Sequence, residues 1–516
     1  GGKFVQVVTK DEMYAIDREA MQLGLHGEML MENAGQAVTA KLISRLSKKN
    51  DRILVVIGKG NNGGDGFVIA RMLKSYGYVT DVWLAVKKED ITGDAEKAMN
   101  IYERSGYTMS SYCEKGVEAF KKALAWSTHI IDAMLGIGMM GSLKPPYQEL
   151  ISLINAEREK YVIAIDLPSG VLADNGTVSE AIQADETIVI HHPKLSAFMY
   201  PSRRYYGEVH VVHIGIPPLV SERVNDKRYV WTAEDVMRTF PKRKPESHKG
   251  THGKGLLIGG STSMSGAIIM SAKAAIRSGS GLLTVAVPEE ARPAVANHVI
   301  EAMYLDCSSK QGYFVGRIEQ LQEQDFDAIA VGPGMGRHEG SRLIVKDLLT
   351  KDVPLLLDAD ALYHLADMLE QLKARKSPTI LTPHEGEMAR LLGVSAREVN
   401  AKRFQLSREF AIAYGVYVVL KGPFTICTTP DGEQFINSTG NVALAKGGSG
   451  DVLTGIILAL MMQQSSLQAA ISNAVYVHGR VADELVKKDH SPIDVIASDL
   501  IEALPDVYRL IANTSL

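Results

Sequence analysis

The sequence is poor in the features that mark several classes of protein. It has only 3 cysteines in 516 residues, widely separated and without a CxxC pair, so neither a disulfide framework nor a structural zinc site is expected. An odd number of cysteines without a motif spacing favours a reducing compartment, and we expect a cytoplasmic protein. The apolar runs are shorter than the ~18 residues that a membrane helix needs, so we expect no membrane partner.

An excess of charge of one sign is also missing. Lys and Arg number 56 against 60 Asp and Glu, which gives a formal net charge of −4 and no strong field toward nucleic acid or anionic membranes. Aromatic residues make up only 6%, too few to favour stacking on single strands. The basic stretch 242–254 contains no Phe, Trp or Tyr, and we interpret it as a solvated linker. Nucleic acid is therefore not an expected partner.

Length and glycine content are what the sequence has in quantity. A chain of 516 residues predicts two to four domains, and 46 glycines predict many tight turns or close backbone approaches. Short apolar runs alternate with helical stretches at Lys10–Met21, Gly66–Ser75 and Gly266–Arg277, which indicates parallel strands covered on both faces in an α/β fold. The predicted strands are Ile53–Ile57, His129–Asp132, Tyr161–Ile165, Leu256–Ile258, Ala328–Val331, Leu355–Leu357, Thr379–Leu381 and Tyr417–Leu420.

We place one domain boundary in the chain, which divides it into domains of 1–225 and 226–516. Ile216-Pro217-Pro218 ends the first apolar series, and a new predicted strand follows the basic stretch. No repeat at a fixed period is found.

A dense glycine run, 58–66, directly follows the first predicted strand. It contains a formal GxGxxG, but Asp81 precedes the next apolar run instead of closing it, so the match to a dinucleotide fingerprint is weak. The Asn and Asp side chains in the run are more than a pyrophosphate turn needs. They suit hydrogen bonds to a ligand and oxygen ligands for a hard cation, although a capped glycine turn is the structural alternative.

Two more predicted strands end in a carboxylate followed by a glycine or proline turn. Asp132 precedes the glycine-rich segment 136–141, and Asp166 precedes Leu-Pro-Ser-Gly. A carboxylate at the tip of a strand can be a proton acceptor or a cation ligand. It can equally be a helix cap, and the pattern of either segment alone leaves the choice open.

Taken in order, NNGGDG, DAMLGIG and DLPSG resemble the NAD(P)HX epimerases over residues 10–216. The resemblance implies a Rossmann-like three-layer α/β/α domain, an isomerase that interconverts the R and S hydrates at C6 of the damaged nicotinamide ring. It implies a K⁺ site at Asn62, Asp132 and Ser169, and Asp166 is our candidate for acid/base assistance. The implied hydrate-binding residues are Asn61, Asn62, Gly63, Gly64, Asp65, Gly136, Ile137, Gly138, Met139, Met140, Gly141, Ser142 and Asp166.

In the second half, the segment Gly447–Gly455 carries the sharpest signal. A glycine run that opens an apolar helix directs backbone N–H groups and the positive end of the helix dipole at one point, which suits a transferring phosphoryl group. Asp451 would accept the proton of the attacking hydroxyl; a glycine-rich N-cap is the alternative. A second glycine run, 259–267, lacks the Gly-Lys-Ser/Thr of a P-loop.

With GGSTSMSGA, GPGMG, DADAL, TPHEGEM and LKG, this segment resembles the ribokinase-like fold and, more closely, the ADP/ATP-dependent NAD(P)HX dehydratases over residues 245–510. The resemblance implies a lyase that phosphorylates the C6 hydroxyl with ADP or ATP and then expels phosphate, while Mg²⁺ screens the transferring charge. The implied hydrate-binding residues are Ala267, Gly336, His384 and Asp451, and the implied nucleotide-binding residues are Lys421, Gly422, Pro423, Phe424, Thr425 and Gly450.

We therefore predict a bifunctional metabolite-repair enzyme whose epimerase supplies the S hydrate that its dehydratase consumes. Its partners would be the small molecules NADHX, NADPHX, ADP and ATP, and we expect a homo-oligomer. One alternative is a ribokinase-type small-molecule kinase with an accessory nucleotide-binding domain, which leaves the NNGGDG segment unexplained. A second alternative is a nucleotide-binding module without turnover.

Overall fold

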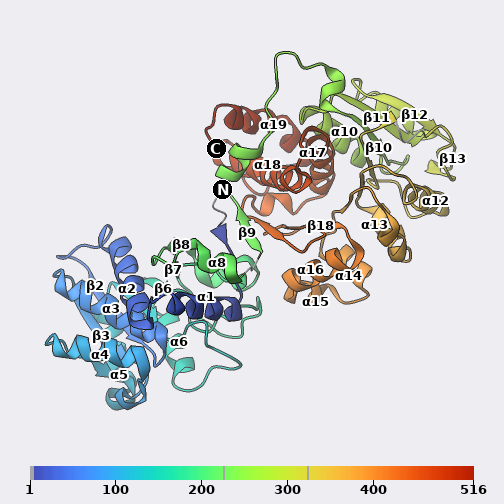
Figure 1. Cartoon of the computed structure of the whole chain (residues 1–516). Helices are drawn as coiled ribbons and strands as arrows, with labels where there is room; N and C mark the ends of the chain where they lie inside the picture. Colours follow the sequence, from blue (N-terminus) through green and yellow to red (C-terminus); the bar gives the residue numbers. More distant parts are fainter. Residues whose placement is uncertain (1–4, 225–226, 322–324) are drawn as a thin grey trace. The chain divides into compact units, whose positions relative to one another are not determined.

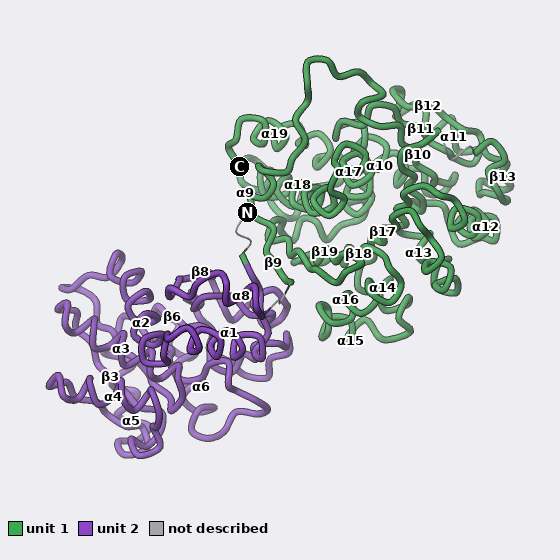
Figure 2. The backbone as a smooth tube through the Cα atoms, in the orientation of Figure 1, with its two compact units in different colours: residues 1–5, 227–516 green, residues 6–226 purple. Residues whose placement is uncertain are grey.

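The computed structural model describes residues 5–224, 227–321 and 325–516. The chain forms two compact units (Figure 2). The N-terminal unit is Gln6–Asp226, and the C-terminal unit is Lys227–Leu516 with Gly1–Val5.

The N-terminal unit is built on a parallel sheet whose strands are β2 (Arg52–Ile57), β3 (Val79–Leu84), β4 (Ser110–Ser111), β5 (His129–Ala133), β6 (Tyr161–Ile165), β7 (Glu186–Ile190) and β8 (Glu208–Val212). The strand order is β4-β3-β2-β5-β6-β7-β8, and every neighbouring pair is parallel. Its helices are α1 (Lys10–Gln22), α2 (Gly27–Ile43), α3 (Asn61–Ser75), α4 (Gly93–Arg104), α5 (Tyr112–Trp126), α6 (Tyr147–Asn155), α7 (Arg203–Tyr206) and α8 (Pro218–Val224).

The three strands predicted in this half coincide with β2, β5 and β6, and all side chains of Ile53–Ile57 are buried. The helix predicted over Gly66–Ser75 begins earlier, at Asn61, so most of the predicted glycine loop is the first turns of α3. The glycines permit this, because a Cβ at Gly63 would overlap the carbonyl oxygen of Gly58. The helix can therefore start directly against the end of the strand.

The strand order reverses between β2 and β5, which lie side by side in the sheet. The connections after these two strands run in opposite directions, and such a switch point opens a crevice at the carboxyl ends of the strands. Asn62 follows β2 and Asp132 lies in β5. Asp166 directly follows β6, the next strand along.

The C-terminal unit has a larger mixed sheet, ordered β1-β9-β20-β19-β18-β17-β16-β15-β10-β11-β12. The strands of the unit are β1 (Val5–Gln6), β9 (Arg228–Trp231), β10 (Lys254–Ile258), β11 (Leu282–Pro288), β12 (Met303–Cys307), β13 (Ser309–Lys310), β14 (Tyr313–Phe314), β15 (Ala328–Val331), β16 (Leu355–Leu357), β17 (Thr379–Leu381), β18 (Tyr417–Leu420), β19 (Ile426–Thr428) and β20 (Gln434–Asn437). Strands β10 to β12 and β15 to β18 are paired in parallel with one another, whereas β19 is antiparallel to both β18 and β20.

Helices cover both faces of this sheet (Figure 1). Along β10, Leu257 packs into one hydrophobic core and its neighbours Leu256 and Ile258 into the other. The first core is closed mainly by α10 (Ser265–Arg277), α17 (Ser449–Gln463), α18 (Leu467–Lys488) and α19 (Ala497–Ala512), and the second by α12 (Glu339–Leu348), α13 (Asp360–Leu365), α14 (Glu385–Leu392) and α16 (Arg403–Tyr414). The remaining helices are α9 (Ala233–Thr239), α11 (Arg292–Ala296) and α15 (Ala396–Ala401). The unit has the α/β fold that the sequence predicts.

The five strands predicted in this half lie within β10 and β15 to β18. The basic stretch 242–254, which we interpreted as a linker, is instead an exposed segment inside the C-terminal unit, since β9 and α9 precede it. It is tied to that unit by Arg243, which donates to the carbonyl of Gly279 at 2.7 Å. Of the helices in the described ranges, none has both the length and the hydropathy of a membrane span.

Candidate active sites

Asp132 is the centre of a buried network at the switch point of the N-terminal sheet. The backbone N–H and hydroxyl of Ser169 donate to its two oxygens, at 2.8 and 2.6 Å. The hydroxyl of Ser169 accepts from the N–H of Leu135 at 2.9 Å, and the amide of Asn62 donates to the carbonyl of Leu135 at 2.7 Å. Burial raises the pKa of Asp132 to about 6, against the lowering effect of its hydrogen bonds. The three residues implied for K⁺ are thus connected.

One amide oxygen of this network lacks a hydrogen-bond donor. Within the described part of the chain, no hydrogen bond reaches the buried Oδ1 of Asn62. A buried acceptor without a donor is unfavourable, and a cation that prefers oxygen ligands would satisfy it. The described residues contain no cluster of three His, Cys, Asp or Glu side chains able to hold a metal. A set of one carboxylate, one amide and one hydroxyl is of a different kind and fits K⁺.

Asp166 is paired with a buried lysine. It adopts a φ of 67°, in the left-handed region that non-glycine residues seldom occupy. Its Oδ1 accepts from Lys194 Nζ at 2.7 Å and from the N–H of Ile190 at 3.0 Å. Lys194 is only 2% exposed, so the ion pair is shielded from water. Our sequence analysis missed Lys194, whose one signal is its place just after the strand β7.

Two further carboxylates lie in the field of this pair. Burial, with a contribution from the charge of Asp166, raises the pKa of Asp17 to about 6, and Lys194 opposes the shift. Burial and the charges of Asp166 and Asp17 raise the pKa of Asp65 well above its usual value. Asp65 was among the predicted hydrate-binding residues, but Asp17, which comes from α1, was not. The site thus combines one carboxylate paired with an ammonium and two whose pKa values are raised by burial.

The other residues predicted to bind the hydrate lie around the start of α3 and in the loop after β5. Gly63 and Gly64 are buried, whereas Asn61 is exposed. A Cβ at Gly136 would lie 3.2 Å from Cβ of Asn62, and one at Gly138 would lie 3.3 Å from the hydroxyl of Tyr14. The loop therefore begins against the hydrogen-bond network of Asp132. Its later part is open to solvent: Ile137 and Met139 are partly exposed, and Met140, Gly141 and Ser142 are exposed.

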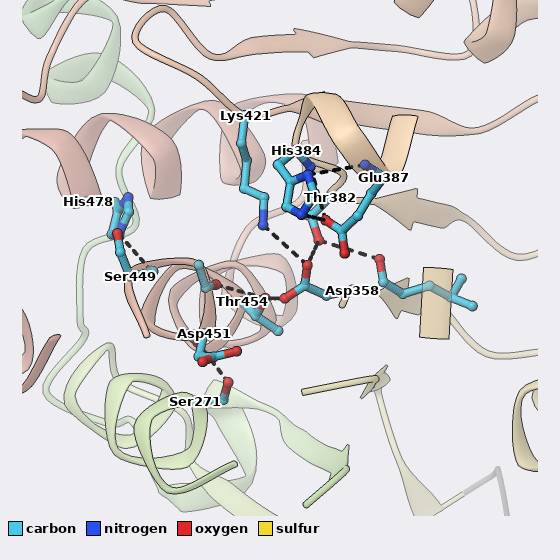
Figure 3. Close-up of polar contacts among 12 residues, drawn as sticks. Ser271, Asp358, Thr382, His384, Glu387, Lys421, Ser449, Asp451, Thr454 and His478 are labelled. Atoms are coloured by element: carbon cyan, nitrogen blue, oxygen red, sulfur yellow. Dashed lines mark hydrogen bonds and ion pairs between the residues drawn. The ribbon is translucent and has the colours of Figure 1, made fainter. Parts of the chain in front are cut away.

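In the C-terminal unit, Lys421 directly follows β18, and its side chain lies beside the start of α17. A Cβ at Gly450 would lie 3.0 Å from Lys421 Nζ, so the ammonium is next to the first turn of the helix (Figure 3). Gly448, the N-cap, has a φ of 89°, which a residue with a side chain rarely adopts. Backbone N–H groups and an ammonium converge here, which is the arrangement that binds phosphate.

Asp358 holds this ammonium and is itself fixed. The residue is 1% exposed, and its carboxylate accepts from the hydroxyls of Thr454 at 2.6 Å and Thr382 at 2.8 Å. Lys421 Nζ lies 3.4 Å from the same carboxylate (Figure 3). We missed Asp358 as a site residue, although the DADAL motif at the end of β16 contains it. These contacts fix the carboxylate of Asp358 beside Lys421.

Asp451 and Glu387 are two carboxylates that titrate near neutral pH. Burial, with a contribution from the charge of Asp358, raises the pKa of each to about 7, while Lys421 lowers both. Glu387 and His384 cap α14 reciprocally, since each accepts from the other's backbone N–H at 3.1 Å. Burial and Lys421 lower the pKa of His384. A base at the Asp451 position can therefore gain and lose a proton at physiological pH.

The remaining residues predicted in this half are also at the carboxyl ends of the strands. Thr425 closes the turn 421–425 by donating to the carbonyl of Gly422 at 3.2 Å, with Pro423 exposed and Phe424 partly exposed at its tip. The N–H of Lys421 donates to the carbonyl of Pro383 at 2.9 Å, which brings the turn beside His384. Gly336 donates its N–H to Asp360 at 2.9 Å, and Cβ of Ala267 lies 3.2 Å from the position that a Cβ at Gly334 would take.

Comparison with known proteins matches each half of the chain to a family model. Residues 255–506 match the model described as NAD(P)H-hydrate dehydratase, and residues 27–196 match the one described as YjeF-related protein N-terminus. The bifunctional NAD(P)H-hydrate repair enzyme Nnr of Moorella thermoacetica is 36% identical, over 98% of this chain and 96% of that enzyme. The enzyme of the same name from Thermofilum pendens is 34% identical, again over 98% and 96%.

A solved structure also resembles the C-terminal half. The ADP/ATP-dependent NAD(P)H-hydrate dehydratase of Bacillus subtilis, crystallised with ATP and Mg²⁺, is 38% identical. It covers 55% of this chain and 98% of its own, with a TM-score of 0.49.

Proposed function

This chain belongs to the family of bifunctional NAD(P)H-hydrate repair enzymes, and we propose that its two sites act in turn on the same damaged cofactor. The matches confirm the predicted family and its two activities, an epimerase in the N-terminal half and a dehydratase in the C-terminal half. The ribokinase-type kinase predicted as the alternative leaves the N-terminal match without a role. The assignments of single residues that follow are our proposals.

We propose that Asp166 is the base of the epimerase. Inverting C6 requires that its hydroxyl leave as water, with a proton supplied, and that water return to the opposite face and lose a proton. Lys194 Nζ lies 2.7 Å from the carboxylate of Asp166 and fixes its position, and we propose that Asp166 takes the proton from the returning water. Asp17 and Asp65, whose pKa values are raised, are placed to supply the proton for the departing one.

We propose that Asn62, Asp132 and Ser169 hold K⁺ beside this site. The support is the unpartnered Oδ1 of Asn62 together with the buried carboxylate of Asp132. A bound K⁺ would supply positive charge and fix the start of α3 against the loop after β5, where the hydrate is expected to bind.

In the dehydratase, we propose that Asp451 accepts the proton of the C6 hydroxyl as its oxygen attacks the terminal phosphorus of ADP or ATP and displaces AMP or ADP. The observation that carries this is Lys421 Nζ beside Gly450, at the N-terminus of α17, where phosphoryl oxygens would meet an ammonium and backbone N–H groups. Phosphate then leaves C6 and a proton is lost from C5 to solvent, and the electrons of the C5–H bond form the C5–C6 double bond of NADH or NADPH. His384 and Gly336 would contact the nicotinamide.

Mg²⁺ fits this site as a companion of the nucleotide. Magnesium is usually held by one or two carboxylates together with substrate phosphates, and bound here it would neutralise charge on the transferring phosphoryl group. Glu387 is the carboxylate that we propose for it, since the pKa of Glu387 is raised to about 7 by burial and by neighbouring carboxylates, a penalty that a cation would relieve.

The test is a coupled assay on a mixture of R and S NADHX, with ADP or ATP, followed by the absorbance of NADH. We expect the wild type to convert both epimers, Asp451→Asn to convert neither, and Asp166→Asn to convert the S fraction only. Asp489→Asn, at a side chain that is 81% exposed, is the matched control and should behave as the wild type. Wild-type failure with both nucleotides would contradict the dehydratase assignment. Full conversion by Asp166→Asn would contradict the role of Asp166.

A cytoplasmic location and a homo-oligomeric assembly remain predictions of our sequence analysis. The location rests on cysteine usage, and Cys113, Cys307 and Cys427 are free thiols in the structure.

A further inference from the structure

Arg403 is a buried cation that the proposed reaction does not use. It is the first residue of α16 and is only 3% exposed. A guanidinium is costly to remove from water unless its donors find acceptors, so its partners show what it organises.

The acceptors around Arg403 belong to the turn that follows β18 and to the start of α14. Nη1 donates to Oε1 of Glu385 at 2.6 Å. Nη2 donates to the carbonyls of Leu420 at 3.1 Å and Phe424 at 3.3 Å, and both nitrogens lie 3.4 Å from the carbonyl of Lys421. The turn therefore wraps its backbone carbonyls around one guanidinium.

Gly422 shows how closely the turn packs on this group. A Cβ at Gly422 would lie 2.8 Å from Nη2 and 3.1 Å from Cζ of Arg403. Only a residue without a side chain allows the backbone to lie at this distance from the guanidinium.

The two segments that Arg403 joins are the two sides of the proposed dehydratase site. The turn 421–425 carries Lys421, which reaches the start of α17 (Figure 3). Glu385 directly follows His384, on the side expected to meet the hydrate. A shift of the guanidinium would move the backbone from which Lys421 projects, while the α14 side keeps its own capping hydrogen bonds between His384 and Glu387.

We propose that Arg403 is a positioning residue for the nucleotide: it sets the conformation of the turn 421–425 so that Lys421 meets the phosphates. The inference rests on the proposed dehydratase function. The planar fork of arginine reaches several carbonyls at once, whereas the ammonium of a lysine carries the same charge without that geometry. Arg403→Lys therefore keeps the positive charge and removes the planar geometry of the guanidinium.

Arg375 is a matched control in the same unit. It is partly buried and, like Arg403, donates to backbone carbonyls, those of Lys351 at 2.8 Å and Val353 at 2.6 Å among them. It precedes β17, at the amino end of that strand, whereas the site lies at the carboxyl ends. Arg375→Lys should cost stability in the same way and leave nucleotide binding intact.

The experiment compares Arg403→Lys, Arg375→Lys and the full-length wild type. It measures the Kd of Mg·ADP by calorimetry without hydrate, the KM values for ADP and for S-NADHX, kcat, and the thermal midpoint. We expect Arg403→Lys to raise the Kd and KM of the nucleotide roughly tenfold with the KM of the hydrate nearly unchanged. Arg375→Lys should lower the thermal midpoint by a similar amount and leave the Kd and KM of the nucleotide unchanged.

Equal nucleotide Kd values in the two lysine variants would overturn the proposal. If Arg403→Lys fails to fold, Gly422→Ala, which presses on the guanidinium from the turn, replaces it; an unchanged nucleotide Kd there would overturn the proposal too. Because the Kd is measured without turnover, wild type that binds Mg·ADP but does not dehydrate S-NADHX would contradict the proposed function and leave this test intact.

Discussion

Asp132 and Asp358 are buried carboxylates that accept several hydrogen bonds each, whereas Asp451 accepts none of comparable strength from a fixed side chain and has a pKa raised to about 7. The difference matches the proposed roles. Hydrogen bonds hold the carboxylates of Asp132 and Asp358 in place, whereas burial and the charge of Asp358 raise the pKa of Asp451 to a value at which it can exchange a proton near neutral pH.

The raised pKa of Asp451 predicts that the residue reduces stability at high pH. The native state binds this proton more tightly than the unfolded chain, so the stability it contributes is present below pH 4 and is lost as the pH rises to about 7. Asp451→Asn should therefore raise the unfolding free energy of the C-terminal unit at pH 8 by roughly 1–3 kcal/mol and leave it unchanged at pH 4. Denaturant titrations at both pH values measure this, with Asp489→Asn as control. A variant less stable than the wild type at pH 8 would contradict it.

Among helices and strands, the starts of α3 and α17 show how glycine prepares a site. In α3, glycines let the first turn lie against the end of β2 and place Asn62 beside the loop after β5. In α17, the glycine at position 450 leaves the space that Lys421 Nζ occupies. In both helices a Cβ at the glycine position would crowd the group packed there, a backbone carbonyl in α3 and the ammonium of Lys421 in α17.

The start of α3 predicts a specific response to potassium. If Oδ1 of Asn62 and the carboxylate of Asp132 share K⁺, KCl should raise the thermal midpoint of the N-terminal unit above its value in NaCl of equal ionic strength, because the ion binds the native state only. Asn62→Ala should abolish the difference between the two salts. Asn50→Ala, at an exposed asparagine of the same unit, should retain it. Equal midpoints of the wild type in both salts would refute the site.

For the whole molecule, each unit has its own sheet, core and complete set of proposed site residues. Because the S hydrate is a small molecule, the epimerase unit of one chain can supply it to the dehydratase unit of another.

This independence predicts complementation between chains. An equimolar mixture of Asp166→Asn and Asp451→Asn should convert both epimers of NADHX, although neither variant does so alone. The absorbance of NADH at completion measures this. A mixture that stops at the S fraction would show that the hydrate does not pass between chains, and doubling the concentration of Asp451→Asn should speed the R phase only.

Sequence alone determined the parts of this protein that local pattern encodes. The apolar runs predicted β2, β5, β6 and the strands β15 to β18, because a strand buried on both faces is apolar throughout. The glycine run before Asp451 predicted the start of α17, and the motifs identified the family. The predicted start of α3 was five residues too late, because a glycine run predicts a loop unless its close packing against another segment is known.

Only the tertiary structure decided which side chains act together. Lys194 and Asp166 are 28 residues apart, and Arg403 lies 18 residues before the carbonyl of Lys421, so neither pair has a spacing that a helix or strand would mark. The pairs exist because parallel strands bring their carboxyl ends to one edge of the sheet, where distant loops meet. Burial then raises the cost of leaving any of these charges unpaired, which makes the partner of each a property of the fold.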